Sequence, residues 1–145
     1  MSHTDDPSLP DASRPHIVVV EDDPETQSEL ARALGDAGAR VVGTGSGEAA
    51  LALLEEWPAG LVVVSDGIAG MGGLEVARRI HASSPKTAIV LMSERPGAGD
   101  ETVTEKKALD ARLAGVFAML TKPFDRRMLA ELVVALVAAT DLAVG

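Results

Sequence analysis

The chain has 145 residues, of which 46% are apolar, and it carries a formal net charge of −9 with no cysteine. This length predicts a single domain with its own core, and the missing cysteines exclude disulfides and thiolate chemistry. An acidic chain is poorly suited to contacting nucleic-acid phosphates, and no apolar run reaches the ~18 residues of a membrane-spanning helix. We therefore expect a cytoplasmic protein that binds neither nucleic acid nor membrane.

The first fifteen residues contain three prolines and few apolar side chains, which predicts a flexible leader. A domain is expected over residues 16–140, followed by a short C-terminal tail at 141–145. Strands are predicted for the apolar, mostly β-branched runs at residues 16–20, 40–44, 61–65, 88–93 and 116–120.

A helix is predicted after each of these strands. Asp23 is a candidate cap for a helix that begins at Pro24 and ends at Gly38, and Ser46 is a candidate cap for the second helix. The other helices are expected over residues 72–84, from near residue 102, and over 125–140. Five strand–helix units in alternation predict an α/β fold, with a doubly wound parallel sheet covered on both faces.

Polar residues follow the predicted strands, at the sheet edge where functional groups of such folds gather. Carboxylates suit Mg²⁺, and a lysine or a hydroxyl can hold phosphoryl oxygens, so the set indicates a cation site beside a phosphate site. The residues are Glu21, Asp22, Asp23, Ser65, Asp66, Ser93, Thr121, Lys122 and Pro123.

Five segments, in this order, resemble the receiver domain of two-component response regulators: IVVVEDDP, SGEAALALL, GMGGLEVARRI, AIVLMS and LTKPF. The resemblance covers residues 16–139 and implies a five-stranded flavodoxin-like (βα)5 fold. It implies that Glu21, Asp22 and the backbone carbonyl of Gly67 bind Mg²⁺, and that Ser93 and Lys122 contact the phosphoryl group.

The same resemblance implies two further features near the fifth strand. The Lys122–Pro123 bond is expected to be a cis peptide, a conformation found mainly before proline. Met119 stands where receivers usually carry a tyrosine or phenylalanine that moves with the switch hydroxyl.

The phosphoacceptor position depends on a count of residues. Receivers usually read aspartate, three small or apolar residues, and then Pro-Gly-Met-Asp-Gly. An ungapped match to Gly70–Gly73 places Ser65 at the acceptor position, with Ala69 in place of the proline and Gly72 in place of the second aspartate. Asp66 would require a slip of one residue, and alternation along a strand would direct its side chain to the other face. Ser65 is the predicted acceptor position, and Asp66 remains the alternative.

A serine at this position changes the expected chemistry. A carboxylate attacks a phosphoryl group as an anion, whereas a serine hydroxyl requires a base, and neither His16 nor His81 is near Ser65 in sequence. The site also loses a carboxylate ligand, so weakened Mg²⁺ binding is expected. We predict a degenerate receiver that acts by protein–protein contact rather than as an enzyme. The alternative is a working receiver in which Asp66 accepts a phosphoryl group from a histidine kinase with Mg²⁺.

The last predicted helix is apolar on most of its surface. Only Glu131 is charged between Met128 and Ala139. Such a helix is either simply buried or partly covered by another protein. The resemblance implies homodimerisation through the fourth helix, fifth strand and fifth helix, and a histidine kinase, phosphotransfer protein or other signalling protein as partner. The chain ends soon after the fifth strand, so we expect a stand-alone receiver or a fragment without an output domain.

Overall fold

The computed structural model describes residues 15–94, 101–122 and 124–144. Most of the expected leader and the expected cis Lys122–Pro123 bond lie outside these residues. The side chains of residues 94, 101–105, 107 and 136–144 are likewise not described. Strands and helices alternate along the described chain. The strands are β1 (His16–Val20), β2 (Arg40–Thr44), β3 (Leu61–Ser65), β4 (Ala88–Glu94) and β5 (Ala118–Lys122). The helices are α1 (Pro24–Asp36), α2 (Gly47–Glu56), α3 (Gly73–Ser83), α4 (Glu101–Leu113) and α5 (Arg126–Val144).

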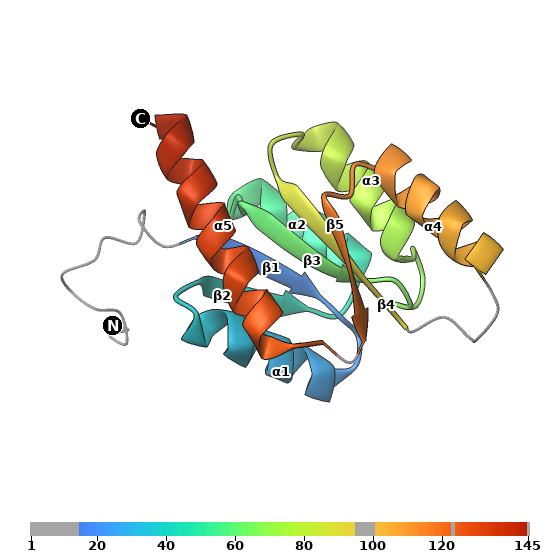
Figure 1. Ribbon diagram of the computed structural model, residues 1–145, viewed down its shortest axis with the longest axis horizontal. Coiled ribbons are helices and arrows are strands. Elements are labelled where there is room, and N and C mark those ends of the chain that lie inside the picture. Colours follow the sequence, from blue (N-terminus) through green and yellow to red (C-terminus); the bar gives the residue numbers. More distant parts are fainter. Residues whose placement is uncertain (1–14, 95–100, 123, 145) are drawn as a thin grey trace.

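All the strands form one parallel sheet in the order β2-β1-β3-β4-β5 (Figure 1). The predicted doubly wound fold is confirmed. β3 lies at the centre with β1 beside it, and β5 lies at an edge. Because all the strands are parallel, the carboxyl ends of β1, β3 and β5 lie at the same end of the sheet.

Alternating side chains divide the core into two layers, one on each face of the sheet. On one face, Val19 of β1 and Val63 of β3 pack with α1 and α5. On the other face, their neighbours Val20 and Val64 pack with α2, α3 and α4. All four side chains are fully buried. Residues two apart along a strand share a face of the sheet and therefore contact the same helices. We call this shared position the parity of a residue along its strand.

The element boundaries follow the sequence signals closely in the first half of the chain. Asp23 and Ser46 cap α1 and α2 through their side chains, as predicted. Gly38, just after α1, has φ of 108°, a conformation that favours glycine. Gly73 begins α3 so close to β3 that a Cβ atom there would lie 2.7 Å from the carbonyl oxygen of Ser65.

Several boundaries in the second half of the chain differ from the predicted ones. β5 spans Ala118–Lys122 rather than 116–120, because the Val116 amide donates to Ala111 at the end of α4 and strand pairing starts from Phe117. β4 continues one residue further, to Glu94, and α5 continues to Val144, through residues assigned above to a tail. Among the described residues, no helix is long and apolar enough to cross a membrane.

Candidate functional site

Three polar side chains extend the same face of the sheet at its carboxyl end. Glu21 follows β1 with the parity of Val19, and Ser65 ends β3 with the parity of Val63. Lys122 ends β5 with the parity of Leu120, which packs in the same layer. The alternation of the strands therefore brings an acid, a hydroxyl and an ammonium group together above the α1–α5 layer.

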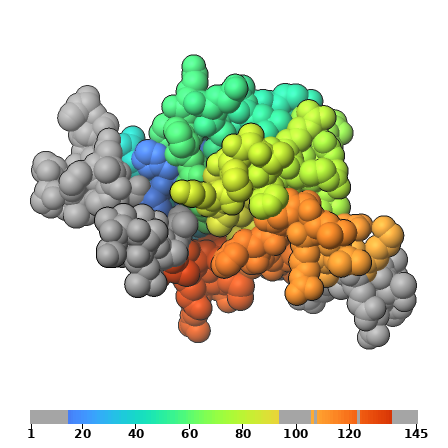
Figure 2. All heavy atoms as spheres, turned by 90° about the horizontal axis from the view of Figure 1, so that it is seen from above, coloured from blue at the N-terminus to red at the C-terminus, as the bar shows by residue number. Residues whose placement is uncertain are grey.

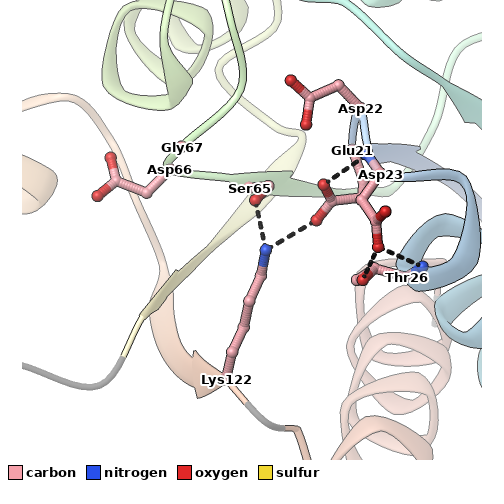
Figure 3. A pocket seen from close by; sticks show the side chains of 8 residues that line it. All are labelled: Glu21, Asp22, Asp23, Thr26, Ser65, Asp66, Gly67 and Lys122. Atoms are coloured by element: carbon pink, nitrogen blue, oxygen red, sulfur yellow. Dashed lines mark hydrogen bonds and ion pairs between the residues drawn. The ribbon is translucent and has the colours of Figure 1, made fainter.

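Lys122 connects the other two residues (Figure 3). Its Nζ atom donates to Ser65 Oγ and to Glu21 Oε1, each at 2.8 Å. The second carboxylate oxygen of Glu21 accepts from the Asp23 amide at 3.0 Å. The side chain of Glu21 is 3% exposed and that of Lys122 is 20% exposed, so this ion pair is largely removed from water. Hydrogen bonds to charged groups in such surroundings are the strong ones.

Asp66 lies next to Ser65 in sequence but is directed differently. In Figure 3 the Asp66 carboxylate points away from Lys122 and Glu21, whereas the Ser65 hydroxyl points toward Lys122. β3 pairs with β4 in an unbroken register that sets Ser65 opposite Met92, and the Asp66 amide donates to the Met92 carbonyl at 2.7 Å. The described strand therefore contains no bulge that would turn Asp66 toward Lys122.

The two other acids at the end of β1 bind backbone amides. Asp22 Oδ2 accepts from the Ala69 amide in the β3–α3 loop at 3.0 Å. Asp23 accepts from the backbone amide and the hydroxyl of Thr26 in the first turn of α1. The hydrogen bonds from Thr26 lower the pKa of the Asp23 carboxyl below its ordinary value.

These groups surround an open cleft of about 400 Å³ at the carboxyl end of the sheet. Acidic side chains outnumber the single ammonium group in its lining, so the formal charge of the lining is negative. Its lining consists of Glu21, Asp22, Asp23, Thr26, Ser65, Asp66, Gly67 and Lys122.

Not every expected site residue lies at this cleft. Ser93 is buried in β4 with the parity of Leu91, which places it on the α2–α3–α4 face of the sheet, and it does not line the cleft. Met119 pairs with Leu91 from the edge strand β5 and is 37% exposed. Thr26 was not among the candidate residues, although its position three residues after a capping aspartate could have indicated it.

The Ala69 amide was also missed as a bonding group. The resemblance to receivers shows only that alanine stands where proline is usual. The signal was present in that replacement, because proline has no N–H to donate and alanine has one.

Fold and cleft together define an α/β domain of the signalling-receiver type. The sequence model described as "Response regulator receiver domain" matches residues 17–134. The chain belongs to this family, and its broad function is that of a receiver domain in two-component signalling. Receiver domains are generally signalling modules rather than enzymes.

The curated relatives include two transcriptional regulators. The chain is 33% identical over 109 residues to the transcriptional activator protein ExaE of Pseudomonas putida, an alignment that covers 74% of this chain and 49% of ExaE. It is 32% identical over 114 residues to the transcriptional regulatory protein AfsQ1 of Streptomyces coelicolor, covering 70% of this chain and 51% of AfsQ1. The chain thus spans about half the length of these relatives.

A solved structure gives the same fold. The BeF3-activated DrrB receiver domain superposes with a TM-score of 0.72 at 26% identity, covering 86% of this chain and 98% of that one. This agreement supports the sheet order and the placement of helices described above.

Receiver domains typically bind Mg²⁺ for phosphorylation, but the cleft fits such an ion poorly. Among residues 15–94, 101–122 and 124–144, no group of three or more His, Cys, Asp or Glu side chains is placed to hold a metal ion. Both carboxylate oxygens of Glu21 already accept hydrogen bonds, and Asp22 Oδ2 accepts one from Ala69. Residue 65 offers a hydroxyl where a carboxylate would be the better ligand for a hard cation.

Proposed function

We propose that this receiver domain acts through protein–protein contact without phosphorylation of residue 65. Ser65 takes the acceptor position in this proposal, and Lys122 and Glu21 hold it in a closed hydrogen-bonded cluster. Asp66 is a neighbour of the site and does not accept the phosphoryl group. The signal is passed on by binding a partner protein rather than by a change in covalent state.

One observation carries the proposal: Lys122 Nζ donates to Ser65 Oγ at 2.8 Å, while Figure 3 shows the Asp66 carboxylate directed away. A receiver lysine that contacts the phosphoryl group must lie beside the acceptor side chain. Here the side chain beside it is Ser65.

The chemistry of the site supports the same conclusion. A serine hydroxyl needs a general base to become a nucleophile at neutral pH. The only group hydrogen-bonded to Ser65 Oγ among the described contacts is an ammonium group, which donates a proton and does not accept one. Glu21 is bound to that same ammonium and to the Asp23 amide, and among the described contacts its carboxylate makes no hydrogen bond to Ser65 Oγ.

The proposal is tested with a small-molecule phosphodonor. The wild-type chain, Ser65→Asp, Ser65→Ala and Asp66→Asn are incubated with acetyl phosphate and Mg²⁺, and phosphoryl incorporation is measured by intact-mass spectrometry. We expect no incorporation in the wild type or in Asp66→Asn. We expect incorporation in Ser65→Asp, because that substitution restores both an anionic nucleophile and a cation ligand.

The alternative function predicts a different pattern from the same samples. If Asp66 is the acceptor, the wild type is labelled and Asp66→Asn is not. Labelling of wild type that survives in Asp66→Asn but is lost in Ser65→Ala would instead show phosphorylation of the serine. Either pattern would overturn the proposal.

The partner surface that we propose is the α4–β5–α5 face, defined by its exposed apolar side chains. In Figure 2 the orange to red atoms of this part of the chain lie together along one side of the molecule. Exposed apolar groups that gather in one region are typical of interaction surfaces. The face consists of Leu109, Leu113, Phe117, Met119, Met128 and Val134.

A second copy of this chain, a histidine kinase or a phosphotransfer protein are the partners that we propose for this face. Phe117→Ser is the sharpest test of self-association, because the Phe117 side chain is 70% exposed and buries little surface within the chain. Sedimentation velocity over a concentration series should show a wild-type dimer that weakens in Phe117→Ser. Glu48→Ser on α2 serves as a surface control. A wild type that stays monomeric at all concentrations would exclude the homodimer.

A further inference from the structure

β5 lies at one edge of the sheet, and part of its backbone has no neighbouring strand. The Phe117 amide donates to the Ile89 carbonyl of β4 at 2.7 Å. The N–H and C=O groups of one strand residue point to the same side, and those of the next residue point to the other side. The backbone groups of Ala118 and Leu120 therefore point away from β4, and among the described residues neither amide has an acceptor outside the sheet.

Exposed apolar side chains surround the β5 edge but not the β2 edge. α4 and α5 pack on opposite faces of the sheet, so they flank β5 on its two sides (Figure 1). In the described part of the chain, every large apolar side chain that is exposed belongs to α4, β5, α5 or the residue before β5. A strand added at β5 would therefore be covered by apolar groups, whereas a strand added at β2 would not.

The residues of β5 are compatible with a second copy of the same strand. Natural proteins protect their edge strands with charged side chains, proline or bulges, and β5 has no charge and no proline from Ala118 to Thr121. Two copies of this segment can therefore meet without opposing like charges. Two identical strands that pair antiparallel are related by a two-fold axis, so each donor of one copy finds its acceptor in the other.

We propose that the chain forms a homodimer in which the β5 strands of two copies pair antiparallel and join the two sheets into one. The inference rests on the proposed function, because it names the partner and the contact for the α4–β5–α5 face. With the two-fold axis beside Met119, Ala118 of one copy faces Leu120 of the other. Each such pair exchanges both of its backbone hydrogen bonds.

Amide exchange tests the pairing in the wild-type chain. Sedimentation velocity gives the dissociation constant, and NMR measures exchange at one protein concentration below it and one above it. The Ala118 and Leu120 amides should exchange about tenfold more slowly at the higher concentration, because each gains an acceptor. The Val41 amide is the internal control. Arg40 donates to a carbonyl on the β1 side, so the Val41 amide points outward at the β2 edge, and its exchange should not depend on concentration.

Two variants test the same contact by affinity. Ala118→Pro removes an N–H that points away from β4, so the sheet of each copy keeps its own hydrogen bonds. Ala118→Gly retains the N–H and is the matched control. By symmetry, Ala118→Pro removes one hydrogen bond from each copy, and its dimer should dissociate with a constant about thirtyfold higher than that of Ala118→Gly. Circular dichroism checks that both variants fold, and if Ala118→Pro does not, the exchange experiment decides.

Three results would overturn the β5 pairing. Exchange of the Ala118 and Leu120 amides that is the same at both concentrations excludes it even if a dimer forms, and so do equal dissociation constants of the two variants. A chain that stays monomeric at all concentrations also excludes it. None of these results concerns residue 65, which phosphoryl incorporation tests separately. Labelling of the wild type would overturn the proposed function and leave the β5 pairing to be decided by amide exchange.

Discussion

The carboxyl end of the sheet and the α4–β5–α5 face differ in what their side chains contact. Polar side chains at the carboxyl end bind one another, whereas apolar side chains on the face are exposed to solvent. At the carboxyl end, Lys122 has two acceptors and Glu21 accepts through both carboxylate oxygens. On the face, Leu113 and Phe117 are 75% and 70% exposed. The first region is polar and its charged groups are already paired, whereas the second is apolar and exposed to solvent.

This difference indicates where binding free energy is available. A ligand that enters the polar cluster must replace hydrogen bonds that are already formed, so the net gain is small. A protein that covers the exposed face removes apolar surface from water, which is favourable by about 25 cal/mol per Å². The comparison favours signalling by surface contact over chemistry at residue 65.

Loss of Lys122 should have the largest effect on the fold. Lys122→Met leaves the buried Glu21 carboxylate without its cation, and we expect the free energy of unfolding to fall by about 3 kcal/mol. Urea denaturation followed by the fluorescence of Trp57, the only tryptophan, measures this change.

A double variant separates the charge effect from lost packing. Lys122→Met with Glu21→Gln removes both charges, so part of the lost stability should return. If the single and double variants are equally unstable, the loss comes from packing and not from the unpaired charge of Glu21.

Gly73→Ala should have the next largest effect. The added Cβ atom would lie 2.7 Å from the Ser65 carbonyl oxygen and 2.8 Å from Asp66 Cα, both of them backbone atoms that cannot rotate away. We expect a loss of about 2 kcal/mol in unfolding free energy. Gly67→Ala in the same loop meets no atom within 4 Å and should change stability by less than about 0.5 kcal/mol. Equal effects of the two substitutions would show that the α3–β3 approach is not tight.

Much of the fold could be predicted because its signals are local. The β-branched runs predicted β1 and β3, and the residues Asp23 and Ser46 predicted the starts of α1 and α2. Alternation along a strand also separates Ser65 from Asp66, since a shift of one residue changes the face. These features depend on residue type and spacing alone.

The features that could not be predicted depend on backbone atoms or on contacts between distant residues. The start of β5 is set by the Phe117 amide, which donates to Ile89 at 2.7 Å, and no property of the Phe117 side chain indicates this. The bond between Asp22 and Ala69 likewise uses a backbone donor that almost every residue type possesses.

Gln27 offers a test of a smaller contribution at the polar end of the sheet. Its Nε2 atom donates to the carbonyls of Glu21 and Thr44 at 2.8 and 3.1 Å. A Cβ atom on Gly43 would lie 2.5 Å from Gln27 Oε1, so Gly43→Ala should displace this side chain. We expect Gln27→Ala and Gly43→Ala each to lower the unfolding free energy by about 1 kcal/mol.

The double variant shows whether the two substitutions act through the same contact. Because Gly43→Ala acts by displacing Gln27, it should have almost no further effect once Gln27 is alanine. Urea denaturation of the wild type, both single variants and the double variant gives the coupling energy. Additive losses would mean that Gly43→Ala destabilises the protein other than by displacing Gln27.

The smallest expected effect concerns Asp23, at the exposed rim of the polar region. Hydrogen bonds from Thr26 lower the folded-state pKa of the Asp23 carboxyl below its ordinary value of 3.8. Its contribution to stability is therefore present above pH 3.8 and is lost as the pH falls through the folded-state pKa. Asp23→Asn keeps a capping oxygen but has no group that titrates. The difference in unfolding free energy between the wild type and Asp23→Asn should therefore shrink as the pH falls below 3.8. A difference that stays constant from pH 6 to pH 3 would show that the charge of Asp23 does not stabilise α1.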